Sequence, residues 1–100
     1  MSTIWKYTLA VQDQQMVSMP VGARVLSVQM QMGALTMWAV VDPARARCNR
    51  VINIYGTGNP IDGAPYGRYV GTVQMTTAGT LHLGAPLVWH VFVEGVEDSL

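Results

Sequence analysis

The chain has 100 residues, of which 50 % are hydrophobic and only 12 % are charged, with six Lys and Arg balanced by six Asp and Glu. This length fits a single domain over residues 1–100, and the apolar content excludes a disordered chain. A net charge of zero argues against nonspecific nucleic-acid binding, because that binding depends on basic side chains that neutralise phosphates. Such a weakly charged surface protects poorly against self-association, so we expect an oligomer or a protein partner.

Short apolar runs alternate with turn residues along the first half of the chain, which is typical of an all-β domain. Strands are predicted at residues 4–11, 16–19, 24–32 and 35–41. The clearest of them is 24–32, where Leu26, Val28 and Met30 alternate with polar residues. Gly33 and Ala34 then permit a tight hairpin. The strand at 35–41 is apolar on both faces, which predicts a central strand or one covered by a partner.

The second half begins with a polar stretch, residues 42–49, which we expect to be a loop. The basic residues in and next to it, Arg45, Arg47 and Arg50, are expected to be solvated, with a contact to an anion or a partner as the alternative. Further strands are predicted at residues 51–55, 68–75, 80–83 and 87–94, followed by a polar tail. The sequence therefore predicts an all-β fold, a small antiparallel barrel or sandwich of about seven strands.

Two features bear on the cellular setting. Cys48 is the single cysteine, so an intramolecular disulfide is impossible, which fits a reducing interior. The N-terminal residues lack the basic and apolar regions of a signal peptide, and no apolar run approaches the length of a membrane helix. We expect no membrane association.

The stretch "VINIYGTGNP" contains a glycine pair, Gly56 and Gly58, on either side of Thr57. A dinucleotide-binding fingerprint would require a third glycine where Ile61 stands, and a Walker loop would require a Lys followed by Ser or Thr. We interpret these residues as a turn that ends a strand. The alternative is a loop whose backbone amides contact an anion, such as a nucleotide phosphate, or a partner.

No group of residues marks a catalytic or metal site. His82, His90 and Cys48 lack a recognised ligand spacing, so we predict no metal and no cofactor. His90 lies between bulky neighbours and is expected to be a half-buried, hydrogen-bonded structural residue. Cys48 is expected to be a free thiol, because no histidine is marked as its base. We therefore predict that the protein is not an enzyme.

Aromatic and basic residues meet where a strand is expected to begin. Tyr66 and Tyr69 flank Arg68, and tyrosine and arginine are frequent at the energetic centres of protein interfaces. A nucleobase could also stack there. Together with the glycine loop, these residues form the predicted binding site: Gly56, Thr57, Gly58, Tyr66, Arg68 and Tyr69.

Several spaced blocks, among them "MWAVVDP", "IYGTGNPI", "YVGTVQ" and "VWHVF", resemble a family of small uncharacterised phage and prophage proteins. The resemblance implies a phage setting and no specific activity. From this resemblance and the absence of a marked catalytic site, we expect an accessory binding protein in the host cytoplasm. An example is an anti-defence protein that binds and inhibits a CRISPR effector or sequesters a nucleotide signal. The alternatives are a virion component, such as a capsid-decorating or tail-associated β protein, and, third, a small enzyme that uses the Gly56 loop.

Overall fold

The computed structural model describes residues 1–76 and 87–98. These residues form seven strands and no helix, which confirms the predicted all-β fold. The predicted strand at 80–83 and His82 lie outside the described residues. The strands are β1 (Thr3–Thr8), β2 (Gln14–Pro20), β3 (Arg24–Gln31), β4 (Ala34–Val41), β5 (Arg47–Gly56), β6 (Arg68–Met75) and β7 (Leu87–Val93).

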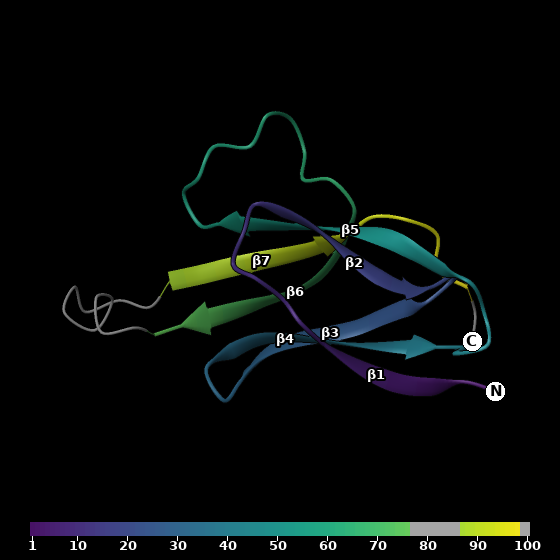
Figure 1. Cartoon of the computed structure of the whole chain (residues 1–100). Helices are drawn as coiled ribbons and strands as arrows, with labels where there is room; N and C mark the ends of the chain where they lie inside the picture. The colour runs from purple at the N-terminus through teal and green to yellow at the C-terminus, as the bar shows by residue number, and fades with distance from the viewer. Residues whose placement is uncertain (77–86, 99–100) are drawn as a thin grey trace.

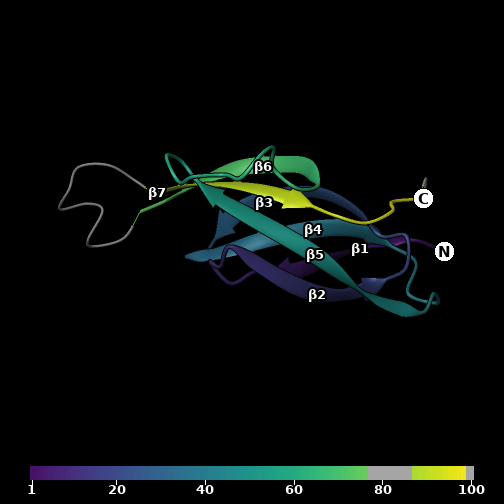
Figure 2. The same ribbon diagram turned by 90° about the horizontal axis from the view of Figure 1, so that it is seen from above.

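The strands form two antiparallel sheets that pack face to face as a sandwich (Figures 1 and 2). The three-stranded sheet has the order β1-β4-β3, and the four-stranded sheet has the order β2-β5-β7-β6. β4 is thus the central strand of its sheet, as its apolar sequence predicted. No helix in the described part of the chain has the length and apolar character needed to cross a membrane.

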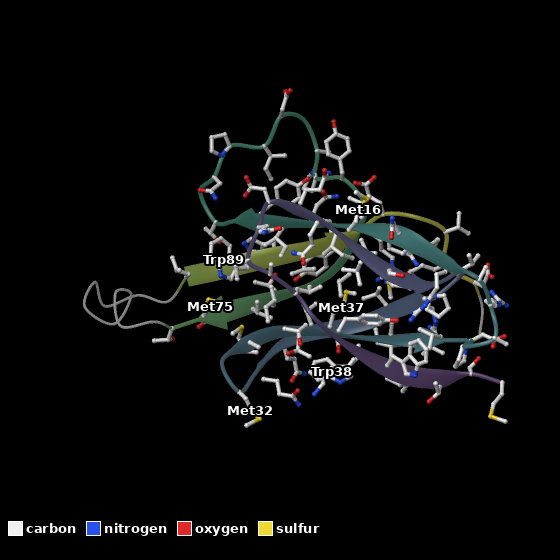
Figure 3. The ribbon with its side chains drawn as sticks, in the orientation of Figure 1. Met16, Met32, Met37, Trp38, Met75 and Trp89 are labelled. Atoms are coloured by element: carbon white, nitrogen blue, oxygen red, sulfur yellow. The ribbon has the colours of Figure 1, made fainter. Side chains whose placement is uncertain are left out.

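The core lies between the two sheets and follows the period-two alternation of the strands. On β4, Leu35, Met37, Ala39 and Val41 face inward and are almost fully buried. They meet inward residues of the four-stranded sheet, namely Met19, Ile52, Ile54, Val73, Val91 and Val93. Figure 3 shows Met37 between the sheets and Trp38 on the opposite side of its strand. Each large apolar side chain buried in this way contributes about 2 kcal/mol to folding.

The hairpin between β3 and β4 turns at Met32 and Gly33, one residue earlier than predicted. Both residues have positive φ, +50° at Met32 and +79° at Gly33. Two positive φ angles in succession are characteristic of a type I′ turn, whose twist matches that of the flanking strands. Met32 takes this conformation although it is not glycine, so the turn geometry here is imposed by the pairing of β3 with β4.

β5 begins earlier than the sequence predicted, at Arg47 instead of Val51. The reason is pairing with β2, which extends to the Pro20–Arg47 pair. The expected loop is present at residues 42–46, but residues 47–50 belong to a strand, and of the arginines in that strand segment Arg47 is exposed as expected whereas Arg50 is not. Arg50 is only 4 % exposed, and its guanidinium donates to the carbonyl of Ala23 at 2.7 Å and to the carbonyl of Glu94 at 2.8 Å.

The segment after β7 is also more than a polar tail. Residues 94–98 run along the edge of the sandwich where β3 and β6 lie close together (Figure 1). Glu97 accepts a hydrogen bond from the backbone N–H of Val25 at 2.8 Å, and the N–H of Asp98 donates to the carbonyl of Gly22 at 3.0 Å. Asp98 also forms an ion pair with Arg45. Arg45 and Arg50 thus bind acidic and carbonyl groups of this chain.

Candidate functional site

The loop from Thr57 to Gly67 leaves β5 and arches over the outer face of the four-stranded sheet before β6 begins (Figure 1). Both of its ends are tied to that sheet. At the start, the N–H of Thr57 donates to the carbonyl of Val88 at 3.2 Å. At the end, the N–H of Tyr66 donates to the hydroxyl of Tyr55 at 3.0 Å. The loop is therefore held over the sheet.

A hollow of about 310 Å³ lies between this loop and the sheet, and we call it the aromatic hollow. It is lined by residues of β5, β6, β7 and the loop: Tyr55, Gly56, Thr57, Gly58, Asn59, Ile61, Pro65, Tyr69, His90 and Phe92. None of these residues carries a formal charge when His90 is neutral. The hollow is thus a mainly apolar surface with a few polar atoms, which is the usual composition of a small binding site.

Three aromatic rings from three strands form one side of the hollow. Phe92 of β7 packs edge to face against Tyr55, with ring centroids 5.5 Å apart and an interplanar angle of 80°. It packs in the same way against Tyr69 of β6, at 5.4 Å and 61°. Such pairs contribute about 1 kcal/mol beyond simple burial, and they fix the relative orientation of the three rings.

His90 connects the loop to the sheet through both of its ring nitrogens. Nε2 lies 2.7 Å from the hydroxyl of Thr57, and Nδ1 lies 3.0 Å from the hydroxyl of Thr72. The Thr72 hydroxyl in turn lies 2.5 Å from the hydroxyl of Tyr69. His90 is half-buried and hydrogen-bonded, as predicted. Both ring nitrogens thus meet hydroxyl groups, whereas the histidine of a Ser-His-Asp site is oriented by a carboxylate.

Four of the six predicted site residues line the aromatic hollow. They are Gly56, Thr57, Gly58 and Tyr69. Tyr66 lies on the loop with a side chain that is 64 % exposed, but it does not line the hollow.

Arg68 is not brought to the hollow either, because adjacent residues of a strand point to opposite faces. Its guanidinium lies 2.7 Å from Glu97 and donates to the carbonyl of Val25 at 2.7 Å. The sequence proximity of Arg68 to Tyr69 thus does not place them in one site.

The glycine pair forms a β-turn, which supports the interpretation as the end of a strand. The N–H of Asn59 donates to the carbonyl of Gly56 at 3.1 Å, which closes a turn of four residues. Gly58 occupies its third position with φ of +86°, as in a type II turn. At Gly56 glycine is needed for lack of space and not for a positive φ, since an added Cβ would lie 3.0 Å from the Trp89 ring. The amides of Thr57 and Asn59 are both used within the protein.

Sequence reasoning missed Tyr55 and Phe92, and it gave His90 only a structural role. The alternation of β7 contained the relevant signal, because His90 and Phe92 share the face opposite to the core residues Val91 and Val93. Cross-strand pairing of Tyr69 with Phe92 then joins β6 to the same surface. Which loop would cover that face was not deducible from the pattern. Within residues 1–76 and 87–98, no group of three or more metal-ligating side chains occurs.

The chain matches the model of one protein family, described as a domain of unknown function (DUF7352), over residues 1–99. It belongs to that family. The search of curated proteins and the search of solved structures each gave no match.

Proposed function

We propose that this member of a family without an assigned activity is an accessory binding protein without catalytic activity, and that its aromatic hollow takes an apolar or aromatic side chain of a protein partner. The uncharged, aromatic lining of the hollow carries this proposal. Tyr69 lines the hollow and is 52 % exposed, and a tyrosine side chain gives a large contact area at low entropic cost.

The same lining argues against a nucleotide as the main ligand. Phosphate recognition in proteins uses Arg, Lys or a set of free backbone amides. The nearest arginine in sequence, Arg68, is bound to Glu97, and the turn amides of Thr57 and Asn59 bind backbone carbonyls. A protein side chain needs neither of these groups, so it fits the hollow better than a phosphate-bearing signal does.

The phage-like sequence blocks suggest the biological setting of this binding. We propose a phage-encoded protein that acts in the host cytoplasm and occupies a host immune factor, such as a CRISPR effector. The alternative is a virion component, for instance a capsid-decorating or tail-associated protein. That alternative is favoured by apolar side chains outside the hollow, such as Ile4 and Met16, which are 58 % and 69 % exposed.

The test compares what the wild-type protein and a hollow variant retain from infected host cells. Tyr69→Ala removes an exposed ring, and Gln74→Ala, also on β6 but outside the hollow, is the matched control. We expect Gln74→Ala to keep the melting temperature of the wild type, and Tyr69→Ala to stay folded with a melting temperature about 5 °C lower, because it loses the edge-to-face contact with Phe92. A protein partner should be retained by wild type and by Gln74→Ala, and at least about tenfold less by Tyr69→Ala.

A nucleotide panel separates the two ligand classes. If a cyclic or linear nucleotide raises the melting temperature of the wild type but not that of Tyr69→Ala, the hollow is a nucleotide site and the proposed protein partner is wrong. A partner retained equally by all three proteins would place the interface elsewhere.

A further inference from the structure

Charged side chains are divided unequally between the two outer faces of the sandwich. The strands of the three-stranded sheet carry two basic residues, Lys6 and Arg24, and no acidic residue. Lys6 pairs across from Trp38, and Arg24 pairs across from Val40. Directly paired residues share a face, so these four residues lie together on the outside of the sheet. We call this surface the basic face.

The opposite side of the molecule carries three acidic residues. Asp62 lies on the loop that arches over the four-stranded sheet, and Asp13 lies beside Asn59 and Pro60 of that loop. Glu94 accepts a hydrogen bond at 2.7 Å from Asn53, which also donates to the carbonyl of Tyr66 on the loop. We call the surface formed by Asp13, Asp62 and Glu94 the acidic face.

The remaining basic residues are occupied elsewhere. Arg45 pairs with Asp42 and Asp98, and both Arg50 and Arg68 pair with Glu97. Arg47 lies 5.3 Å above the Trp5 ring. Three carboxylates thus neutralise Arg45, Arg50 and Arg68 where the C-terminal segment lies, whereas Arg47 contacts an uncharged ring and adds one positive charge. The molecule is neutral as a whole, yet its two broad faces carry opposite charge.

Both faces also expose apolar side chains. On the basic face Ile4 is exposed and Trp38 is half-exposed. On the acidic side Met16 and Tyr66 are exposed. Figure 3 shows Met16 and Trp38 on opposite sides of the sandwich. Arg24 also lines a hollow with Glu97 and Asp98 at the edge of the basic face, but these two carboxylates are paired with other arginines. Each face thus combines an apolar area with a net charge of one sign, which is suited to a partner surface of the other sign.

We propose that the partner of each face is a second copy of this chain, with the basic face of one copy packed against the acidic face of the next. The complementary surface is present on the same molecule, whereas contact between two basic faces would bring Lys6 and Arg24 against their own copies. Contact between unlike faces is heterologous, so it builds rings or linear assemblies. This inference goes beyond the proposed function, and none of its residues lines the aromatic hollow.

Two charge-reversed variants test the arrangement. In the first, Lys6→Glu and Arg24→Glu reverse the basic face. In the second, Asp13→Lys and Asp62→Lys reverse the acidic face. Light scattering should give the wild type a mass that rises with concentration above the 10.9 kDa of one chain. In about 0.5 M NaCl the mass should fall toward that value, because salt screens exposed charges.

Each variant alone should stay monomeric, since its two faces carry the same sign. An equimolar mixture of the two should associate again, because each reversed face then meets an opposite charge on the other variant. Circular dichroism should show that both variants keep the wild-type fold.

Two results would overturn the proposal. A wild type that remains monomeric at all concentrations would show that the faces do not bind each other. Association of the Asp13→Lys and Asp62→Lys variant at wild-type strength would show that the acidic face is not involved. Neither result would affect the test of the hollow, which measures the retention of another protein by Tyr69→Ala.

Discussion

Arg68 and Glu97 form a bidentate ion pair, with guanidinium nitrogens 2.7 and 3.1 Å from the two carboxylate oxygens. The pair also takes up both backbone groups of Val25, since Glu97 accepts from its N–H and Arg68 donates to its carbonyl. Val25 begins the bulge of β3, where pairing with β4 is interrupted. The two side chains therefore bind backbone groups that a neighbouring strand would otherwise bind at this edge. They also fix the C-terminal segment to the sandwich.

Replacing Glu97 by Gln should lower the stability of the protein in a pH-dependent way. Burial raises the pKa of the Glu97 carboxyl, but hydrogen bonds from Arg68 and Val25 and the charges of Arg68 and Arg50 lower it more, so the pKa lies below 4.5. A lowered pKa means that the folded state favours the ionised form. The carboxylate thus stabilises the fold above pH 4.5, and this contribution is lost as the pH falls through the lowered pKa.

Urea unfolding at two pH values measures this effect. At pH 7, Glu97→Gln should reduce the free energy of unfolding by about 2 kcal/mol, whereas at about pH 3 the difference from wild type should be smaller. Asp62→Asn is the control, because Asp62 is exposed on the loop and should change stability little. A difference that is equal at both pH values would contradict the assigned ionisation.

The two arginines that flank Cys48 and Asn49 should respond very differently to alanine. Arg50→Ala leaves the carbonyls of Ala23 and Glu94 without their donor inside the protein, so we expect a loss of about 3 kcal/mol. Arg47 is exposed and contacts the Trp5 ring, so Arg47→Ala should remove about 1 kcal/mol or less. Chemical denaturation compares the two variants directly, and equal losses would mean that Arg50 is not an interior residue.

Alanine at two glycines of the loop should separate backbone strain from steric clash. Gly58 has φ of +86° and open space around it, so Gly58→Ala should destabilise the protein by about 1 kcal/mol through strain alone. Gly67 has φ of +98°, and an added Cβ would lie 2.6 Å from the carbonyl oxygen of Val93. Gly67→Ala should therefore destabilise by about 2 kcal/mol or more. Thermal melting ranks the two, and the reverse order would contradict this geometry.

His90 should control how firmly the loop is held over the sheet. His90→Ala removes the contacts to Thr57 and Thr72, which should reduce stability by about 1 kcal/mol and expose the start of the loop. Hydrogen exchange at the amide of Thr57, bound to the carbonyl of Val88, should become faster in this variant. Thr72→Val breaks only the contact on the sheet side, so it should affect that amide less. Unchanged exchange in His90→Ala would show that the loop does not depend on the histidine.

The sequence by itself determined the fold class and most of the strands. Alternation of apolar and polar residues predicted the strands, and the apolar sequence of residues 35–41 favoured the central place that β4 takes in its sheet. Glycine, proline and asparagine marked the long loop, and the missing third glycine and lysine argued correctly for a turn at Gly56–Asn59. These features depend on local backbone chemistry, so they can be deduced from neighbouring residues alone.

Tertiary structure decided which distant residues meet. Pairing with β2 extends β5 to Arg47, so that Arg50 lies in the strand with its side chain buried. The C-terminal segment supplies Glu97, which binds Arg68 on the side away from Tyr69. The aromatic hollow exists only because Phe92 of β7 lies between Tyr55 and Tyr69 of its two neighbouring strands. Strand order and the partners of buried charges depend on contacts between residues far apart in the chain, and no local pattern in a single sequence encodes them.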